Sequence, residues 1–273
     1  MTHDENNPEE IRRLFFGIEV FAPWHQKLPR GRLLDENHRH LTLAFLGEAN
    51  FTKLMQALPT FPKPLFKVGL VGFFDSLLFL PERHPHVVAW YVEWLHSQNV
   101  LEQYHKEVLH WLVNLGFNPD IRDEFLPHVT ICRQPFFPRE WKKAFQPLPL
   151  IAKDIHLYES MGHLKYEPRW TYSLKAPFEE IEHTADIAFN IRAENLEQLY
   201  LNAQCALAFK FPQLLPYLQK MKQENLEEII IGLNEIVAKA DSEVGCPFKA
   251  ISFHGELETE EDNVLLWEMI IDV

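Results

Sequence analysis

Apolar and polar residues alternate along several stretches of the first 176 residues, and this pattern predicts β-strands. Between these stretches, apolar residues recur every three or four positions, which predicts helices. The strands are expected at residues 12–20, 38–47, 65–75, 85–94, 125–133, 152–160 and 169–176, and the helices at 50–61, 99–117 and 138–145. The order is strand, strand, helix, strand, then strand, helix, strand, helix, strand, strand. This order predicts a pseudo-symmetric α+β fold, in which two related halves surround a central cleft.

The helix at 99–117 has the clearest pattern of the three. Its apolar stripe consists of Leu101, Tyr104, Val108, Leu112 and Leu115, and Gly116 provides a stop signal.

Two strands carry the same small motif, a histidine, one apolar residue and a threonine. The motif occurs as His40-Leu41-Thr42 and as His128-Val129-Thr130. Because side chains alternate between the two faces of a strand, each imidazole lies beside its hydroxyl, away from the apolar face. If the strands are symmetry mates, two imidazoles and two hydroxyls converge on one cleft.

Such a cleft suits the cleavage of a phosphodiester. One imidazole can act as a base and the other as an acid near neutral pH, because the unperturbed histidine pKa is about 6.5. The hydroxyls can donate hydrogen bonds to the non-bridging phosphate oxygens as charge builds up on them. This chemistry requires no metal ion.

Longer segments around these motifs resemble the two-histidine (2H) phosphoesterases of the LigT-like group, the RNA 2′,3′-cyclic phosphodiesterases or 2′-5′ RNA ligases. The similar segments are RRLFFGIEV, HLTLAFLGE, LPHVTICR and the pair LYES and YEPRWTYSL, within residues 12–176. The resemblance implies a bilobal 2H fold that hydrolyses a 2′,3′-cyclic phosphate at an RNA end to a 2′-phosphomonoester. It also implies His40 as the acid, His128 as the base, and Thr42 and Thr130 as phosphate ligands.

Arg133 matches the basic position that follows the second motif in this family, which implies that it binds the substrate. Strict alternation from Thr130 places Arg133 on the opposite face of the strand. We therefore expect a β-bulge or a strand end to turn its side chain into the cleft.

The last third of the chain differs in charge. Residues 1–176 contain 20 Lys and Arg and 20 Asp and Glu, whereas residues 177–273 contain 6 and 19, so the net charge of −13 lies in the last third. This asymmetry predicts two domains, at 11–176 and 177–273. Since an acidic surface repels phosphates, we expect RNA to bind the first domain.

The acidic third predicts a small α+β domain. Strands are expected at residues 185–193, 248–258 and 264–273, and helices at 196–209 and 223–241, with Asn195 as the cap of the first helix and Asn225 or a neighbouring residue as the cap of the second. Asp186 and Asp272 lie at strand ends. Together with the carboxylate of Val273, they could form an oxygen-rich site for Mg²⁺, Mn²⁺ or Ca²⁺.

Residues 178–273 resemble archease, the acidic protein that assists the GTP-dependent RNA-splicing ligase. The similar segments are EHTADI, NLEQLYLNAQCALAF, FKAISFH and WEMIIDV. The resemblance implies metal binding by Asp186, Asp272 and Val273, and a ligase as partner. Only residues 240–247 replace the long β-rich stretch of archease, so this domain is much shortened.

The sequence thus predicts an RNA-end-processing protein, with no cofactor for the phosphodiesterase and a divalent cation in the archease-like domain. Cys132, Cys205 and Cys246 are dispersed, and no leader or membrane-spanning stretch is evident, so we expect a cytoplasmic protein without a membrane partner. Two alternatives stay open. One is a phosphodiesterase for small cyclic or 2′,5′-linked nucleotides, and the other is a non-enzymatic adaptor of an RNA-splicing ligase.

Overall fold

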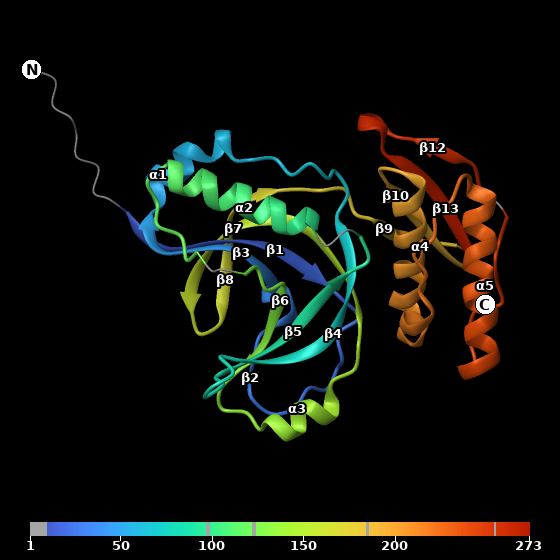
Figure 1. Ribbon diagram of the computed structural model, residues 1–273, viewed down its shortest axis with the longest axis horizontal. Coiled ribbons are helices and arrows are strands. Elements are labelled where there is room, and N and C mark those ends of the chain that lie inside the picture. The colour runs from blue at the N-terminus through green and yellow to red at the C-terminus, as the bar shows by residue number, and fades with distance from the viewer. Residues whose placement is uncertain (1–9, 97–98, 122–123, 184–185, 254) are drawn as a thin grey trace, which may run out of the picture.

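The chain folds into two units that lie side by side, each with its own sheet and helices (Figure 1). The computed structural model describes residues 10–96, 99–121, 124–183, 186–253 and 255–273. The strands of the first sheet lie within residues 11–172, and those of the second within residues 178–272. The predicted boundary between residues 176 and 177 therefore falls in the connection between the sheets. Both units combine antiparallel strands with helices, which confirms the predicted mixture of α and β structure.

The first unit contains the predicted strands and helices in the predicted order. Its strands are β1 (Ile11–Phe21), β2 (Arg32–Leu33), β3 (His40–Asn50), β4 (Leu70–Leu80), β5 (Val87–Trp94), β6 (His128–Arg133), β7 (Pro149–Gly162) and β8 (Lys165–Tyr172). Its helices are α1 (Phe51–Ala57), α2 (Asn99–Asn114) and α3 (Pro138–Ala144), with 3-10 turns at Glu36–His38 and Leu58–Thr60. The two-residue strand β2 was not predicted, because it is too short to show a period.

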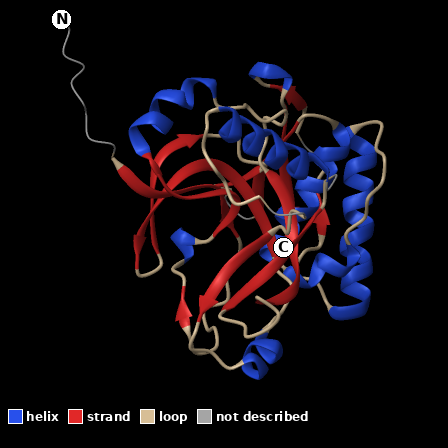
Figure 2. Cartoon of the chain, turned by 60° about the vertical axis from the view of Figure 1, so that its left-hand side comes forward, coloured by secondary structure: helices blue, strands red, loops and turns tan. Residues whose placement is uncertain are grey.

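The strands of this unit form a closed ring. Their order is β1-β3-β6-β5-β4-β7-β8, and β1 also pairs with β7, which closes the ring over six strands. The strands β2 and β8 extend it at β6 and β7. Figure 2 shows these strands curving around a common centre, with helices at the periphery. Closure leaves β1, β3, β4, β5, β6 and β7 with partners on both edges and holds them in fixed register.

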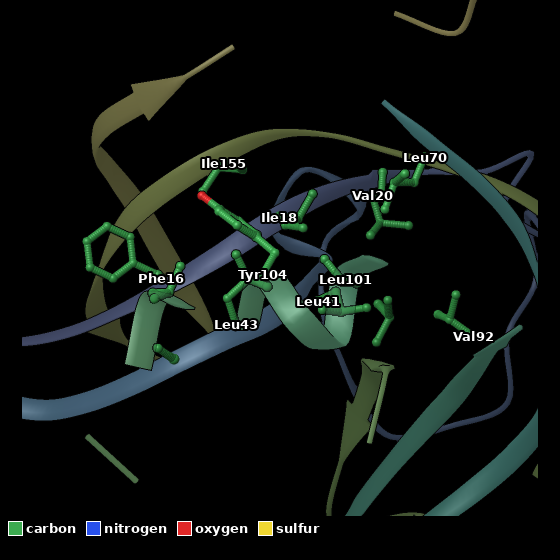
Figure 3. Close-up of a cluster of buried hydrophobic side chains, with 14 of the residues drawn as sticks. Phe16, Ile18, Val20, Leu41, Leu43, Leu70, Val92, Leu101, Tyr104 and Ile155 are labelled. Carbon is green, nitrogen blue, oxygen red and sulfur yellow. The ribbon is translucent and has the colours of Figure 1, made fainter. Parts of the chain in front are cut away.

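Helix α2 lies across the strands and seals the core of the ring. Its buried side chains include Leu101, Tyr104, Val108 and Leu112, as the sequence predicted, whereas Leu115, the fifth residue of the predicted stripe, lies beyond the end of the helix and is half-buried. They meet side chains from several strands, among them Phe16, Ile18, Val20, Leu41, Leu43 and Ile155 (Figure 3). The helix ends at Asn114, two residues before Gly116, whose φ of 78° lies in the left-handed region. The side chains on one face of β1 and β3 are therefore buried in the core, and those on the other face point away from it.

The second unit has a smaller antiparallel sheet in the order β11-β13-β10-β9, with β12 paired to β13. Its elements are β9 (Phe178–Ile181), β10 (Ile187–Ala193), α4 (Leu196–Lys210), α5 (Leu226–Val244), β11 (Ala250–Ile251), β12 (Leu257–Thr259) and β13 (Leu265–Asp272), with 3-10 turns at Pro212–Tyr217 and Glu261–Asn263. Asn195 and Asn225 each accept a backbone N–H bond at the start of a helix, which confirms both predicted caps.

The two units share a hydrophobic core. Helix α4 packs against β4 and β7, and Val71, Leu95 and Ile151 of the first unit belong to the buried cluster of the second. The thiol of Cys205 on α4 lies 3.7 Å from the carbonyl oxygen of Leu150. Within the described ranges, no helix has both the length and the apolar character needed to cross a membrane.

Candidate active site

The two predicted H-x-T motifs lie on neighbouring strands. Strands β3 and β6 are antiparallel and pair at Leu41 and Val129. In an antiparallel pair the flanking positions face one another, so His40 is opposite Thr130 and Thr42 is opposite His128. Leu41 and Val129 are buried in the core, so the four polar side chains share the face that points away from it. The fold therefore brings the four predicted residues together on one patch.

A β-bulge in β6 carries Arg133 onto the same patch. Thr130 pairs with Ala89 and Cys132 pairs with Val88, which leaves Ile131 as the extra residue. Ile131 and Cys132 both point into the core, where each is fully buried. The bulge shifts the alternation by one residue, so Arg133 returns to the face of Thr130 and lines the cleft. The bulge or strand end that the sequence required is present.

Strand β3 has the same irregularity after its own motif. Thr42 pairs with Gly17 and Ala44 pairs with Phe16, so Leu43 is the extra residue. Leu43 and Ala44 are both buried, and Phe45 consequently lines the cleft. In both strands the third residue after the threonine enters the cleft, Phe45 in one and Arg133 in the other. Sequence reasoning missed Phe45, although its position matches that of Arg133 in the second motif.

Four of the predicted site residues, His40, Thr42, Thr130 and Arg133, line a cavity of about 350 Å³, whereas His128 is not among its lining residues. It is lined by Arg13, Phe15, Arg32, His40, Thr42, Phe45, Thr130, Arg133, Ser160, Gly162, His163, Leu164 and Tyr166. The segment from Ser160 to Tyr166 is the hairpin between β7 and β8, which forms one wall. Among the described residues that line the cavity, three are arginines and none is acidic. The chain as a whole carries a net charge of −13, whereas the cleft has a local excess of positive charge. This positive charge suits an anionic ligand.

Both histidines are held in the same tautomer by the backbone. His40 Nδ1 lies 2.7 Å from the carbonyl oxygen of His38, and His128 Nδ1 lies 2.7 Å from that of Leu126. A carbonyl can only accept, so each Nδ1 carries the hydrogen and donates it. In the neutral ring Nε2 then holds the lone pair. Each imidazole thus has one fixed nitrogen and one nitrogen able to take or give a proton.

His40 is enclosed by aromatic rings. The ring centroids of Phe15, Tyr158 and Tyr166 lie 4.7, 5.3 and 4.9 Å from that of His40, and the residue is only 9% exposed. Burial lowers the pKa of His40 to about 4, the bond to the His38 carbonyl opposes this, and the charges of His128, His38 and Arg133 lower it further. Gly17 lies against this ring, and a Cβ there would lie 3.1 Å from the carbonyl oxygen of Leu41 and 3.4 Å from His40 Cδ2.

This electrostatic environment bears on the expected role of His40 as the acid. A general acid must carry a proton before it can donate one, and with a pKa of about 4 His40 is neutral at pH 7 in the free protein. A phosphate anion beside the ring favours the charged imidazolium and raises the pKa. The assignment of His40 as the acid and His128 as the base stays a prediction.

Two further arginines, which the sequence analysis did not predict as site residues, also line the cleft. Arg32 on β2 pairs directly with Arg133 on β6, although like charges opposite one another destabilise a sheet. Arg13 on β1 lies with its guanidinium carbon 5.1 Å from the centroid of Phe45. Within the described part of the chain, neither Arg13, Arg32 nor Arg133 forms an ion pair with a carboxylate, and Arg133 Nε is buried without a hydrogen-bond partner. Only the fold reveals this cluster, since its members come from three separate strands.

Known proteins carry a comparable sequence. The RNA 2′,3′-cyclic phosphodiesterase of Thermotoga maritima is 28% identical over 141 residues, covering 46% of this chain and 69% of the relative. That similarity supports a relation between this chain and the 2H phosphoesterases. The apo structure of LigT from Escherichia coli is 24% identical and covers 61% of this chain and 99% of that one, with a TM-score of 0.43. A structure from Thermus thermophilus is 18% identical, covers 60% and 98%, and has a TM-score of 0.43. No protein-family model matches the chain.

The predicted metal ligands lie in the second unit, away from the cleft. Ile187 pairs with Ile271, so the neighbouring Asp186 and Asp272 stand at adjacent ends of β10 and β13. The motif that precedes β10 also contains Thr184 and Ala185, which lie outside the described residues.

The contacts at these strand ends differ from those of a formed metal site. Asp186 Oδ2 lies 3.6 Å from His183 Nδ1, and Asp272 Oδ1 lies 3.4 Å from the Ser252 hydroxyl. The ammonium of Lys249 donates to the Val273 carbonyl oxygen over 2.5 Å, so a cation there would compete with an existing positive charge. In the ranges that the structure describes, no three His, Cys, Asp or Glu residues gather as a metal-binding group.

Proposed function

We propose that this protein hydrolyses the 2′,3′-cyclic phosphate at an RNA end to a 2′-phosphomonoester, without a metal ion in the reaction. The observation that supports this most directly is the pairing of the two H-x-T motifs, with both histidines held by backbone carbonyls in the same tautomer. The sequence relation to the Thermotoga maritima enzyme supports the same substrate class.

The reaction needs two proton transfers and no redox step. The base, proposed as His128, takes a proton from a water molecule whose oxygen attacks phosphorus. The bond between phosphorus and O3′ breaks, and the acid, proposed as His40, gives its proton to O3′. Water thus contributes a hydroxyl to phosphorus and a proton to the sugar, and the phosphate stays on O2′.

The remaining residues stabilise charge during this step. Negative charge grows on the non-bridging oxygens as water adds to phosphorus. The hydroxyls of Thr42 and Thr130 and the guanidinium of Arg133 are the donors that we propose for these oxygens. Because Arg133 Nε has no hydrogen-bond partner among the residues that the structure describes, it is free to donate to a bound phosphate.

In this mechanism His40 acquires its proton together with the substrate. The cyclic phosphate brings one negative charge into a cleft whose described lining has no acidic residue, and this charge raises the pKa of His40 from its low value in the free protein. Substrate binding and protonation of His40 are then coupled, so binding of the cyclic phosphate should take up a proton at neutral pH.

The experiment is the hydrolysis of an RNA oligonucleotide that ends in a 2′,3′-cyclic phosphate, with and without EDTA. We expect the product to carry a 2′-phosphate and the rate to be equal in both reactions. A 3′-phosphate product, or loss of turnover in EDTA, would contradict the mechanism. A protein that binds the oligonucleotide but never turns it over would favour the adaptor alternative.

For the second unit we keep two predictions that follow from its resemblance to archease. One is a divalent cation held by Asp186, Asp272 and the carboxylate of Val273, and the other is a GTP-dependent RNA-splicing ligase as partner. Calorimetric titration of Mg²⁺, Mn²⁺ and Ca²⁺ into the wild type and Asp186→Asn tests the first. Equal heats in both proteins would exclude Asp186 as a ligand.

A further inference from the structure

The cleft contains more positive charge than one cyclic phosphate requires. A 2′,3′-cyclic phosphate carries one negative charge and two non-bridging oxygens. Thr42, Thr130 and Arg133 already supply donors for both oxygens, and Arg32 stands directly opposite Arg133. Arg13 is therefore left over, in a lining whose described residues include three arginines and no carboxylate.

Arg13 lies at a different place in the cleft from the two motifs. It projects from the start of β1, where its strand partner is Glu48, whereas Thr42 lies opposite Gly17, four residues further along β1. At the rise of an extended strand, four residues correspond to roughly 13 Å. The guanidinium lies over the ring of Phe45, which the bulge in β3 turns into the cleft.

An aromatic ring beside a guanidinium is a common way to bind one nucleotide of a single strand. The ring stacks on the base, and the guanidinium binds the phosphate next to it. We propose, on the basis of the proposed function, that Arg13 and Phe45 bind the nucleotide that precedes the cyclic end. Phe45 stacks on its base, and Arg13 binds its phosphodiester. The substrate class is then an RNA oligonucleotide of at least two residues, in preference to a cyclic mononucleotide.

Three substrates separate this subsite from the catalytic one. They are a 2′,3′-cyclic mononucleotide, a dinucleotide that ends in a 2′,3′-cyclic phosphate, and the same dinucleotide with an uncharged methylphosphonate linkage. We expect the wild type to have its highest kcat/KM on the charged dinucleotide. Rising salt should lower that value more steeply than the value for the mononucleotide, because an additional phosphate contact is screened.

The matched variants are Arg13→Gln and Arg12→Gln. Arg12 is the adjacent residue, but it points to the other face of β1 and forms an ion pair with Glu159 at 2.8 Å. We expect Arg13→Gln to lower kcat/KM on the charged dinucleotide by about 10- to 100-fold, the usual effect of losing a hydrogen bond to a charged group. Its values on the mononucleotide and the methylphosphonate should stay within about twofold of the wild type, and Arg12→Gln should change none of the three.

The outcomes distinguish this inference from the proposed function. If the wild type hydrolyses none of the substrates, the proposed function fails. If it hydrolyses them and Arg13→Gln loses activity equally on the mononucleotide and the dinucleotide, Arg13 binds the cyclic phosphate itself and the subsite is wrong. An unchanged dinucleotide rate also overturns the inference. A thermal melt of each variant confirms that it is folded, and Arg13→Lys, which keeps the charge, should retain part of the dinucleotide preference.

Discussion

The strands β3 and β6 have the same local design and place their histidines in different surroundings. Each has a histidine whose Nδ1 donates to the carbonyl oxygen two residues earlier, and each has a bulge directly after its threonine. His40 is surrounded by three aromatic rings and is buried. His128 is half-buried, and its partner on β5 is Tyr91. The third residue after the threonine is Phe45 in one strand and Arg133 in the other.

The comparison shows that a repeated motif can fix geometry without fixing chemistry. The backbone bond and the bulge depend on neighbours within a few residues, so both strands share them. Burial depends on what the rest of the fold places nearby, and at His40 the β7–β8 hairpin contributes Tyr166, whose ring centroid lies 4.9 Å from that of His40. The backbone bond that fixes the tautomer is thus common to both histidines, whereas the lowered pKa of His40 comes from its own surroundings.

The largest expected effect concerns the part of the design that the strands share. His40→Ala and His128→Ala should each lower kcat on the cyclic-phosphate oligonucleotide by about 10²–10⁴-fold, because each removes one proton transfer. The double variant should lose much less than the product of the two, because the pair acts as a unit. Steady-state kinetics measure the rates, and circular dichroism confirms folding. Full activity in either single variant would mean that the two strands do not share one reaction.

The next effect tests the difference in burial. Because the pKa of His40 falls from about 6.5 in the unfolded chain to about 4 in the folded one, the unfolded state binds more protons between these values. This contribution to stability is present above pH 6.5 and is lost as the pH falls through about 4, with an upper bound on the order of 3 kcal/mol.

Urea unfolding of the wild type and His40→Gln between pH 4 and 7 measures this contribution. The variant has no imidazole to protonate, so its stability should fall less over this range than that of the wild type. Parallel curves would show that His40 is not held neutral by its aromatic surroundings.

A smaller effect follows from the residue after each bulge. Arg133→Met should lower kcat/KM by about 10- to 100-fold on the cyclic mononucleotide and the dinucleotide alike, since the guanidinium is proposed to bind the phosphate common to both. Phe45→Leu should affect the dinucleotide only. The same set of substrates measures both. If Phe45→Leu impaired both substrates equally, the two positions would serve the same phosphate and the contrast between the strands would disappear.

The smallest effect concerns the β7–β8 hairpin, which contributes Tyr166 to the surroundings of His40. Its turn residues His163 and Leu164 have φ of 51° and 65°, in the left-handed region that glycine adopts without strain. Leu164→Gly should raise the free energy of unfolding by about 1 kcal/mol, because the left-handed conformation costs a side-chain-bearing residue roughly that much. Denaturant titration measures the change, with Leu126→Gly, at an exposed position without positive φ, as the control. Equal stability changes in the two variants would argue against strain at the turn.

The sequence by itself determined the local elements and which side chains share a face. Strand alternation placed His40 beside Thr42 and His128 beside Thr130, and the spacing of α2 gave its buried stripe. The asparagine caps of α4 and α5 were also predictable. Even a bulge or strand end before Arg133 could be inferred, because a period of two leaves that side chain on the wrong face. These features depend on backbone geometry over a few residues, which the sequence contains directly.

Only the tertiary structure decided the composition and the electrostatics of the cleft. Arg13, Arg32 and Phe45 have no motif of their own, and they meet because β1, β2 and β3 are joined through the ring to β6. The low pKa of His40 likewise arises from Phe15, Tyr158 and Tyr166, which lie on three other strands. The physical reason is that desolvation and charge repulsion depend on distances between residues far apart in the chain, and those distances exist only once the ring has closed.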